Sequence, residues 1–241
     1  AFMQKYLGDY SGLKICFDLS NGMANLFAKK IFGENHDYLF DTIDGRFPNH
    51  EPNPLVHKNV VPLENLVKEK KADIGVIYDG DADRVMFVDN EGEFISPDLM
   101  IALLGYYFIG ERNERGIVLQ DIRSSKAVGE FLEPQGCKME TWKVGRAFAA
   151  QKLRDIDGLW GGELAGHYYF RDFFYSDSGL LASILVLRVV ALLKKQGVTI
   201  AEAVRKLKTY ENSGEINFRV EDKAGAMEAV KDFFCSQAKP T

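Results

Sequence analysis

The 241-residue sequence predicts an α/β protein with two consecutive α/β domains and the start of a third. Short apolar runs typical of strands alternate with amphipathic segments typical of helices, and this alternation extends over two blocks of similar length. Apolar residues make up 46% of the chain, enough to build a core in each block. We therefore expect a first domain at residues 1–95, a second at 96–208 and the start of a third at 209–241.

The first block predicts a layered unit of strands and helices. Its first helix should open at Asn21–Gly22 and close at Gly33. Its second helix carries acidic residues early and lysines late, as the helix dipole favours. The expected elements are a strand at 14–20, a helix at 21–33, a proline-bearing loop at 44–55, a helix at 62–72, a strand at 73–78 and a hairpin at 84–96. Within the loop, His50 is interpreted as a packing or capping residue.

The second block begins at Pro97 and follows the same alternation. Its expected elements are helices at 96–111, 124–136, 146–157, 178–197 and 200–210, strands at 116–122 and 137–145, and a turn between short strands at 158–170. A strand at 215–222 and a helix at 224–234 would begin the third unit.

Composition excludes several classes of protein. The net charge of −5 argues against a general nucleic-acid-binding protein, but it allows a phosphorylated ligand held by a few cations. The three cysteines are widely spaced, which predicts reduced thiols in a cytoplasmic protein. The longest apolar segment is interrupted by Arg188, so we expect no membrane span. The chain begins at Ala1 and stops soon after a new strand and helix, so we expect both ends to be cuts through a longer protein.

Three aspartates follow the apolar run 73–78 at alternate positions, Asp79, Asp81 and Asp83, in the sequence DGDADR. A glycine and an alanine keep the intervening positions small, so the loop can bring the carboxylates together. Carboxylates this close repel one another unless a divalent cation lies among them, and oxygen ligands of this kind suit Mg²⁺. Arg84 adds a cation for a phosphate oxygen. The alternative is a solvated acidic turn between two strands.

Two other motifs share part of this pattern. An EF-hand loop requires glycine at its sixth position and an acidic residue at its twelfth, where this chain has Arg84 and Asn90, so that motif fails. A haloacid-dehalogenase-type phosphatase places an Asp-x-Asp pair after an apolar strand, as Asp79 and Asp81 are placed. In that alternative Asp79 is the nucleophile. Its usual threonine is Asp83 here, and a hairpin follows instead of a helix.

A glycine-rich stretch, GLWGGELAGHYYF, carries Glu163 and His167 four residues apart. Its glycines allow a tight loop with backbone close to a ligand. A carboxylate and an imidazole presented together suit hydrogen bonding to neighbouring sugar hydroxyls. The alternative is a hairpin turn in which both residues are incidental. The following Asp172, Asp177 and Ser178 are interpreted as loop and helix-cap residues.

Two groups of cations lie beside expected helix starts. The segment WKVGR places Lys143, Gly145 and Arg146 at a strand-to-helix junction, and Arg123 lies in a similar context. Cations beside a helix N-terminus form a plausible anion site. The alternative is a solvated basic turn.

Together these segments resemble the α-D-phosphohexomutase family, in particular its bacterial phosphomannomutase/phosphoglucomutase type. DGDADR (79–84) is similar to the family's metal-binding loop, and GELAGH (162–167) to its sugar-binding loop. WKVGR (142–146), FPNHEPNP (47–54) and DLSNGMA (18–24) are similar to three further family segments. The resemblance covers nearly the whole chain. It implies the family's second and third domains, each with a mixed sheet, and the start of its fourth.

The resemblance implies an enzyme that interconverts hexose 1-phosphates and 6-phosphates, of glucose or mannose, through a phosphoserine. It implies that Asp79, Asp81 and Asp83 bind Mg²⁺ and that Arg84 contacts the transferring phosphoryl group. It also implies that Glu163, His167, Lys143, Gly145, Arg146 and Arg123 bind the phosphosugar.

The sequence departs from the family pattern in ways that limit this implication. These residues contain neither the family's serine loop nor the phosphate loop of its fourth domain, so we expect this chain alone to be inactive and to need the flanking domains of the same protein. Ala165 stands where the family usually has serine, Arg146 where it has histidine, and Arg123 where lysine is common. The sugar preference therefore stays open. A non-catalytic module that binds a sugar phosphate or a metal is the remaining alternative.

Overall fold

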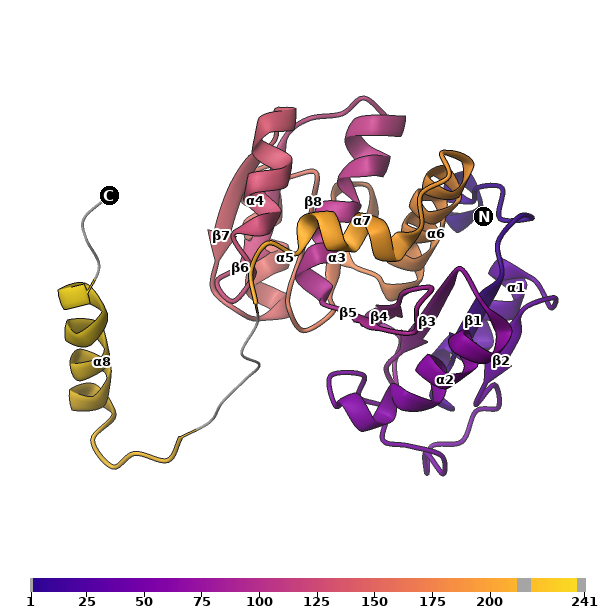
Figure 1. Cartoon of the computed structure of the whole chain (residues 1–241), viewed down its shortest axis with the longest axis horizontal. Coiled ribbons are helices and arrows are strands. Elements are labelled where there is room, and N and C mark those ends of the chain that lie inside the picture. The colour runs from indigo at the N-terminus through magenta and orange to yellow at the C-terminus, as the bar shows by residue number, and fades with distance from the viewer. Residues whose placement is uncertain (1, 212–217, 238–241) are drawn as a thin grey trace. The chain divides into compact units, whose positions relative to one another are not determined.

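The computed structural model describes residues 2–211 and 218–237, which fall into two compact units divided after Tyr210. The first unit holds two five-stranded sheets with flanking helices (Figure 1). In the second unit the expected helix is α8, Lys223–Gln237. The strand expected at 215–222 lies partly outside the described residues, and 218–222 have no strand conformation.

The first sheet is mixed. Strand β1 runs parallel to both β2 and β3, and β4 pairs antiparallel with both β3 and β5. In spatial order the strands are β2 (Asp37–Leu39), β1 (Ile15–Asp18), β3 (Ile74–Tyr78), β4 (Val85–Val88) and β5 (Phe94–Ile95). The three parallel strands therefore deliver their carboxyl ends, including the residues before Asp79, to one edge of the sheet.

The second sheet repeats this topology strand for strand. Here β6 runs parallel to β7 and β8, while β9 pairs antiparallel with β8 and β10. The strands are β7 (Lys138–Trp142), β6 (Ile117–Asp121), β8 (Trp160–Gly162), β9 (Tyr168–Phe170) and β10 (Ser176–Asp177). The two sheets also share a local contact. Asp18 and Asp121 end β1 and β6, and each carboxylate accepts a hydrogen bond at 2.8 Å from the backbone N–H of the residue two positions later. The third strand of each sheet leads into one of the loops that the sequence singled out.

Helices cover the sheets on both faces. The helix α2 (Val61–Lys70) packs on the first sheet through Leu63 and Val67, and α5 (Arg146–Asp155) packs on the second through Leu153. The opposite faces of the two sheets share one continuous core with α6 (Gly179–Lys195), and α6 lies across β3 and β4. The remaining α-helices are α1 (Ala28–Phe32), α3 (Pro97–Leu103), α4 (Ala127–Leu132) and α7 (Ile200–Leu207).

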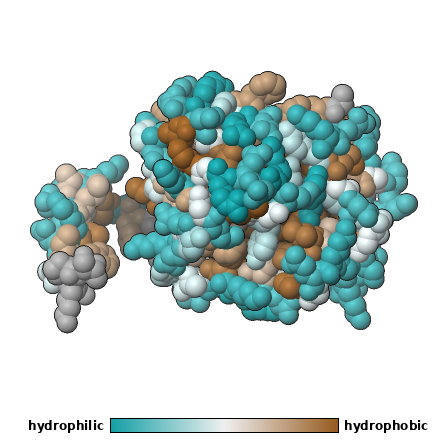
Figure 2. All heavy atoms as spheres, turned by 90° about the horizontal axis from the view of Figure 1, so that it is seen from above, coloured by the Kyte–Doolittle hydropathy of each residue, from teal (hydrophilic) through white to brown (hydrophobic). Residues whose placement is uncertain are grey.

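Buried apolar strands leave a largely hydrophilic surface. Figure 2 shows hydrophilic residues over most of the visible face, with apolar patches between them. None of the described helices combines the length and the apolar composition needed to cross a bilayer.

The structure confirms the predicted fold class, corrects two expected elements and adds one strand that was not predicted. The helix expected at 21–33 is a 3₁₀ turn at Met23–Leu26 followed by α1, because Phe27 between them has a φ of −129°, outside the helical range. The helix expected at 96–111 ends at Leu103 and continues as a π-helical turn, Tyr106–Glu111. The strand β2 was not predicted, because its three residues are only partly buried and lack an apolar run.

Candidate active site

The two loops that the sequence singled out meet in space, because Arg84 and His167 form an isolated antiparallel β-bridge. Beside it the N–H of Val85 donates to Gly166 O at 3.1 Å. Gly166 has a φ of +89°, and a Cβ there would lie 2.7 Å from Met86 Cε. Only glycine fits this close approach without strain. The loop after β3 is thus placed against the loop after β8.

The aspartate loop brings its three carboxylates together. Asp79 is 2% exposed, Asp83 is half-buried and Asp81 is exposed, and one oxygen of each lies within 4.8 Å of those of the others. Burial raises the pKa of Asp79 to about 6, although Arg84 opposes this shift. A buried carboxylate with two acidic neighbours is stabilised in its charged form by a cation. Three oxygen donors at this spacing fit a hard divalent metal.

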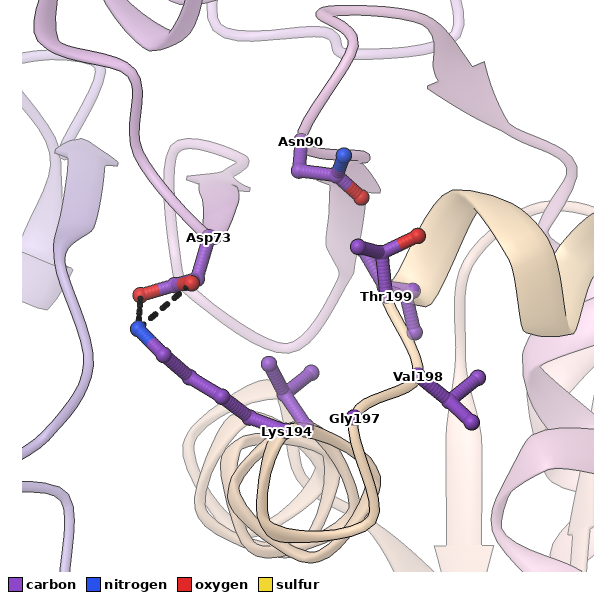
Figure 3. A pocket seen from close by; sticks show the side chains of 8 residues that line it. Asp73, Asn90, Lys194, Gly197, Val198 and Thr199 are labelled. Carbon is purple, nitrogen blue, oxygen red and sulfur yellow. Dashed lines mark hydrogen bonds and ion pairs between the residues drawn. The ribbon is translucent and has the colours of Figure 1, made fainter.

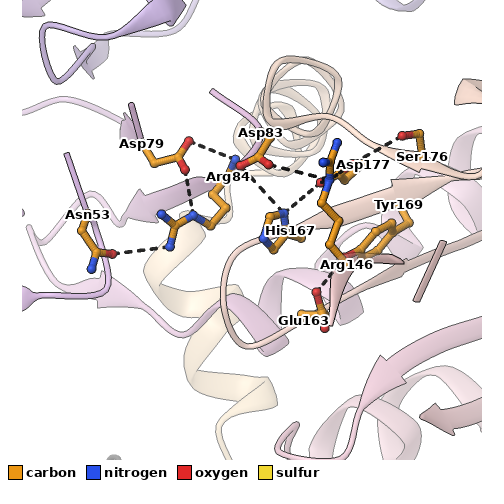
Figure 4. Close-up of polar contacts among 10 residues, drawn as sticks. All are labelled: Asn53, Asp79, Asp83, Arg84, Arg146, Glu163, His167, Tyr169, Ser176 and Asp177. Atoms are coloured by element: carbon orange, nitrogen blue, oxygen red, sulfur yellow. Dashed lines mark hydrogen bonds and ion pairs between the residues drawn. The ribbon is translucent and has the colours of Figure 1, made fainter. Parts of the chain in front are cut away.

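Arg84 is fixed at the base of this loop. Its Nε donates to Asp79 Oδ2 at 2.7 Å, and its backbone N–H donates to Asp79 Oδ1 at 3.2 Å. Its Nη1 reaches Asn53 Oδ1 at 3.5 Å (Figure 4). Asn53 belongs to the loop at 44–55, so that loop also reaches the site. The guanidinium is therefore held beside the carboxylates in one orientation.

Glu163 points into the protein. It is 2% exposed, Oε1 accepts a bond from the N–H of Gly145 at 2.7 Å, and Oε2 accepts one from the hydroxyl of Tyr169 at 2.7 Å. Gly145 precedes α5 with a φ of +130°, outside the range that other residues favour. Glu163 thereby fixes the segment 143–146 against the loop after β8.

His167, Arg146 and Asp177 form a charged cluster beside Asp83 (Figure 4). His167 Nδ1 lies 2.9 Å from Asp177 Oδ2, and Arg146 Nε donates to the same oxygen at 2.7 Å. His167 Nδ1 and Arg146 Nε also approach Asp83, at 3.9 Å and 3.7 Å. Burial raises the pKa of Asp177, but the bonds from His167 and Arg146 outweigh it and hold that pKa below its ordinary value.

The other two predicted cations lie nearby but are directed differently. Arg123 is bound by Asp121, whose Oδ2 accepts from Arg123 Nη2 at 2.7 Å and from the N–H of Leu164 at 2.9 Å. This contact joins the turn after β6 to the loop after β8. Lys143 Nζ lies 3.6 Å from the centre of the Phe148 ring. Arg123 is therefore tied to the site through Asp121, while Lys143 lies on an exposed aromatic ring.

The sequence interpretation missed two residues. Asp177 was interpreted as a loop or cap residue, yet it ends β10 and binds both His167 and Arg146. Asn53 lies in the proline-bearing loop at 44–55, and no local signal marks it as a contact of Arg84. The interpretation of Ser178 is confirmed, because its Oγ caps α6 by accepting from the N–H of Leu181 at 3.1 Å. His50 is a packing residue that also contacts Asp18 at 3.1 Å.

A separate pocket of about 240 Å³ lies where α6 leads into α7 (Figure 3). Lys194 Nζ contacts both carboxylate oxygens of Asp73, at 2.7 and 2.8 Å, and Asn90 Oδ1 accepts from the N–H of Ala201 at 3.1 Å. These contacts join α6 and α7 to the first sheet. The pocket contains none of the predicted site residues.

Two protein-family models match consecutive parts of the chain. Residues 5–92 match the family model for phosphoglucomutase/phosphomannomutase, alpha/beta/alpha domain II, and residues 96–229 match the model for alpha/beta/alpha domain III. The phosphomannomutase of Methanocaldococcus jannaschii is 33% identical over 227 residues, which are 93% of this chain and 50% of that protein. The chain thus spans about half the length of the curated relatives it matches.

Solved structures agree with the family match. A phosphoglucomutase/phosphomannomutase family protein from Burkholderia thailandensis superposes with a TM-score of 0.71 and 28% identity, covering 87% of this chain and 46% of that chain. The Aspergillus fumigatus N-acetylphosphoglucosamine mutase, solved in complex with GlcNAc-6P and magnesium, shares the fold with a TM-score of 0.61 and 15% identity, covering 98% of this chain and 60% of that one. Because both family models match and a relative is 33% identical over 93% of this chain, the chain belongs to the phosphoglucomutase/phosphomannomutase family.

Proposed function

We propose that this chain supplies the metal-binding and sugar-binding part of a phosphohexomutase, with the metal loop in a domain at residues 1–95 and the sugar loop in a domain at 96–208. The substrates would be hexose 1-phosphates and 6-phosphates such as those of glucose and mannose. The metal would be Mg²⁺, and the setting the cytoplasm. The observation that carries the proposal is the β-bridge between Arg84 and His167, which joins a carboxylate loop to an imidazole-bearing loop.

Each residue of the site has a role that follows from its contacts. Asp79, Asp81 and Asp83 would hold the Mg²⁺, which when bound neutralises charge on a phosphoryl group. Arg84, fixed by Asp79, presents a guanidinium to phosphate oxygens beside that position. His167 bonds Asp177 through Nδ1, which directs Nε2 away from that carboxylate and leaves it for a sugar hydroxyl. Arg146, Arg123 and Lys143 add positive charge for a second phosphate.

Glu163 would act chiefly by positioning. Both of its oxygens already accept hydrogen bonds, from Gly145 and Tyr169. Each carboxylate oxygen can accept more than one bond, so a sugar hydroxyl can join these donors. The contact with Gly145 also holds Arg146 at the first turn of α5.

The phosphatase alternative gains no support from this geometry. Its nucleophile, Asp79, is 2% exposed, and both carboxylate oxygens accept bonds from Arg84. The chain matches the phosphohexomutase models over both sheets, which favours the role of Asp79 as a metal ligand.

Calorimetric binding of glucose 6-phosphate and mannose 6-phosphate, with and without Mg²⁺, tests the proposal. We expect Mg²⁺ to strengthen binding of at least one hexose phosphate to the wild-type chain, and His167→Ala to weaken it. Phosphate release from these sugars by the chain would favour the phosphatase. Binding that neither Mg²⁺ nor His167→Ala changes would contradict the proposed site.

A further inference from the structure

Arg146 occupies a position between two carboxylates that belong to different loops. Its Nε lies 2.7 and 2.9 Å from the two oxygens of Asp177 and 3.7 Å from Asp83 Oδ2 (Figure 4). The guanidinium carries a full charge at all physiological pH values. The positive charge of Arg146 therefore lies within ion-pair distance of a carboxylate that also belongs to the aspartate loop.

Asp83 is shared by two groups of potential ligands. Its oxygens lie within 4.8 Å of those of Asp79 and Asp81, and also within 4.8 Å of His167 and Asp177. In the second group Arg146 supplies a positive charge, because its Nε contacts Asp177 and approaches Asp83. Arg146 thus supplies to this second group the charge that a bound metal would supply to the first.

We propose that Arg146 is an internal counter-cation that competes with the divalent metal for Asp83, and that a ligand phosphate relieves this competition by binding Arg146. The inference rests on the proposed metal site. A positive charge beside a ligand carboxylate opposes a second cation there by Coulomb repulsion. When an anion takes the guanidinium, Asp83 becomes free for the metal. By linkage, metal and phosphate must then strengthen each other's binding by the same factor.

The surroundings of Arg146 allow it to exchange partners. Its side chain is 58% exposed, whereas that of Asp177 is 1% exposed and that of Arg84 is 23% exposed. Asp177 is thus the fixed anchor, and Arg146 is a long side chain that can turn toward a ligand in the solvent. Arg84 donates through both its backbone N–H and its Nε to Asp79, so it lacks this freedom.

Titration of the chain with Mn²⁺, followed by electron paramagnetic resonance, tests the inference without any assay of activity. We expect Arg146→Gln to tighten Mn²⁺ binding roughly two- to fivefold, the range that a partly exposed ion pair is worth. Arg146→Lys keeps the charge and should stay close to the wild type. Arg154→Gln removes the same charge from an exposed arginine of the same helix, bonded to Phe174 O at 2.9 Å, and serves as the matched control.

Replacing chloride by sulfate at constant ionic strength tests the coupling. Sulfate, as a probe for phosphate, should tighten Mn²⁺ binding to the wild type and have a smaller effect on Arg146→Gln. Equal Mn²⁺ affinity in the wild type and Arg146→Gln, or equal tightening by Arg146→Gln and Arg154→Gln, would overturn the inference and leave the metal site intact. If neither the wild type nor Arg146→Gln binds Mn²⁺, both the inference about Arg146 and the proposed metal site are overturned.

Discussion

Arg84 and His167 pair in an antiparallel bridge, although 82 residues lie between them in the sequence. Each residue ends the loop that follows the third strand of its own sheet. The pairing therefore joins equivalent points of two sheets with the same topology. A carboxylate loop and an imidazole-bearing loop become one site through this contact.

Gly166→Ala should separate these loops. A Cβ at Gly166 would lie 2.7 Å from Met86 Cε and 3.3 Å from Val85 O, and the φ of +89° is unfavourable for alanine. We expect the free energy of unfolding to fall by about 1–3 kcal/mol. Denaturant titration measures this loss. Gly12→Ala is the control, because a Cβ there meets nothing within 4 Å and should change stability by less than about 0.5 kcal/mol.

Asp81→Asn should remove the stabilisation by Mg²⁺ while leaving the metal-free stability nearly unchanged, because Asp81 is exposed. At a Mg²⁺ concentration ten times Kd, binding stabilises the wild type by about 1.4 kcal/mol. That corresponds to about 3–6 °C in Tm for a chain of this size. Differential scanning calorimetry with Mg²⁺ and with EDTA measures it. Asp155→Asn, at an exposed carboxylate bonded to Gln151, should keep the full shift.

His50→Gln should change how stability depends on pH. Burial alone would lower the pKa of His50, but the neighbouring Asp18 carboxylate and the Glu51 carbonyl raise it above the ordinary value. A raised pKa in the folded state stabilises the protein below the unfolded value of about 6.5, and this contribution disappears as pH rises through the folded pKa. The wild type should therefore exceed His50→Gln in stability by more at pH 5.5 than at pH 8.5.

His36→Gln provides the control of opposite sign. Burial lowers the pKa of His36, so protonation favours the unfolded state. The stability of the wild type relative to His36→Gln should increase from pH 5.5 to pH 8.5. Urea titrations at pH 5.5 and pH 8.5 measure the free energy of unfolding of the wild type and of both variants. Parallel trends for the two histidines would contradict the assignment of Asp18 as the partner that holds His50 protonated.

Tyr78→Phe should weaken the attachment of β3, the strand before the aspartate loop, to α6. The Tyr78 hydroxyl donates to Ser183 Oγ at 2.7 Å, and both side chains are fully buried. Losing this bond should cost about 0.5–1.5 kcal/mol of unfolding free energy. Tyr38→Phe removes an exposed bond to Gly33 O, which water can replace, so it should cost less. If chemical denaturation shows the same loss of unfolding free energy for Tyr78→Phe and Tyr38→Phe, the buried contact between Tyr78 and Ser183 adds no stability.

Local pattern was sufficient to predict most of the fold. The strand β3 within the run 73–78 is buried throughout, because α2 covers one of its faces and α6 covers the other. The helix boundaries at α6 and α7 follow from the Ser178 and Thr199 caps, which are local signals. The topological repeat is not visible as a sequence repeat, since each sheet needs only apolar strands in the same order.

The site was predictable only in part, because its partners come from distant segments. The chain itself places Asp79, Asp81 and Asp83 within one loop. Nothing local indicates that Asp177 binds Arg146, since that contact depends on how α5 and β10 meet. Long-range ion pairs of this kind require the tertiary fold.

The most direct test of the account is whether the metal and the phosphosugar share one site. Relaxation of the two ³¹P signals of glucose 1,6-bisphosphate by Mn²⁺, measured with the wild-type chain and Asp81→Asn, reports the proximity of the metal to the phosphate. We predict that the wild-type chain enhances relaxation of one phosphorus more than the other, and that Asp81→Asn removes this enhancement. Equal relaxation of both signals, or an enhancement that survives Asp81→Asn, would contradict a shared site built on the aspartate loop.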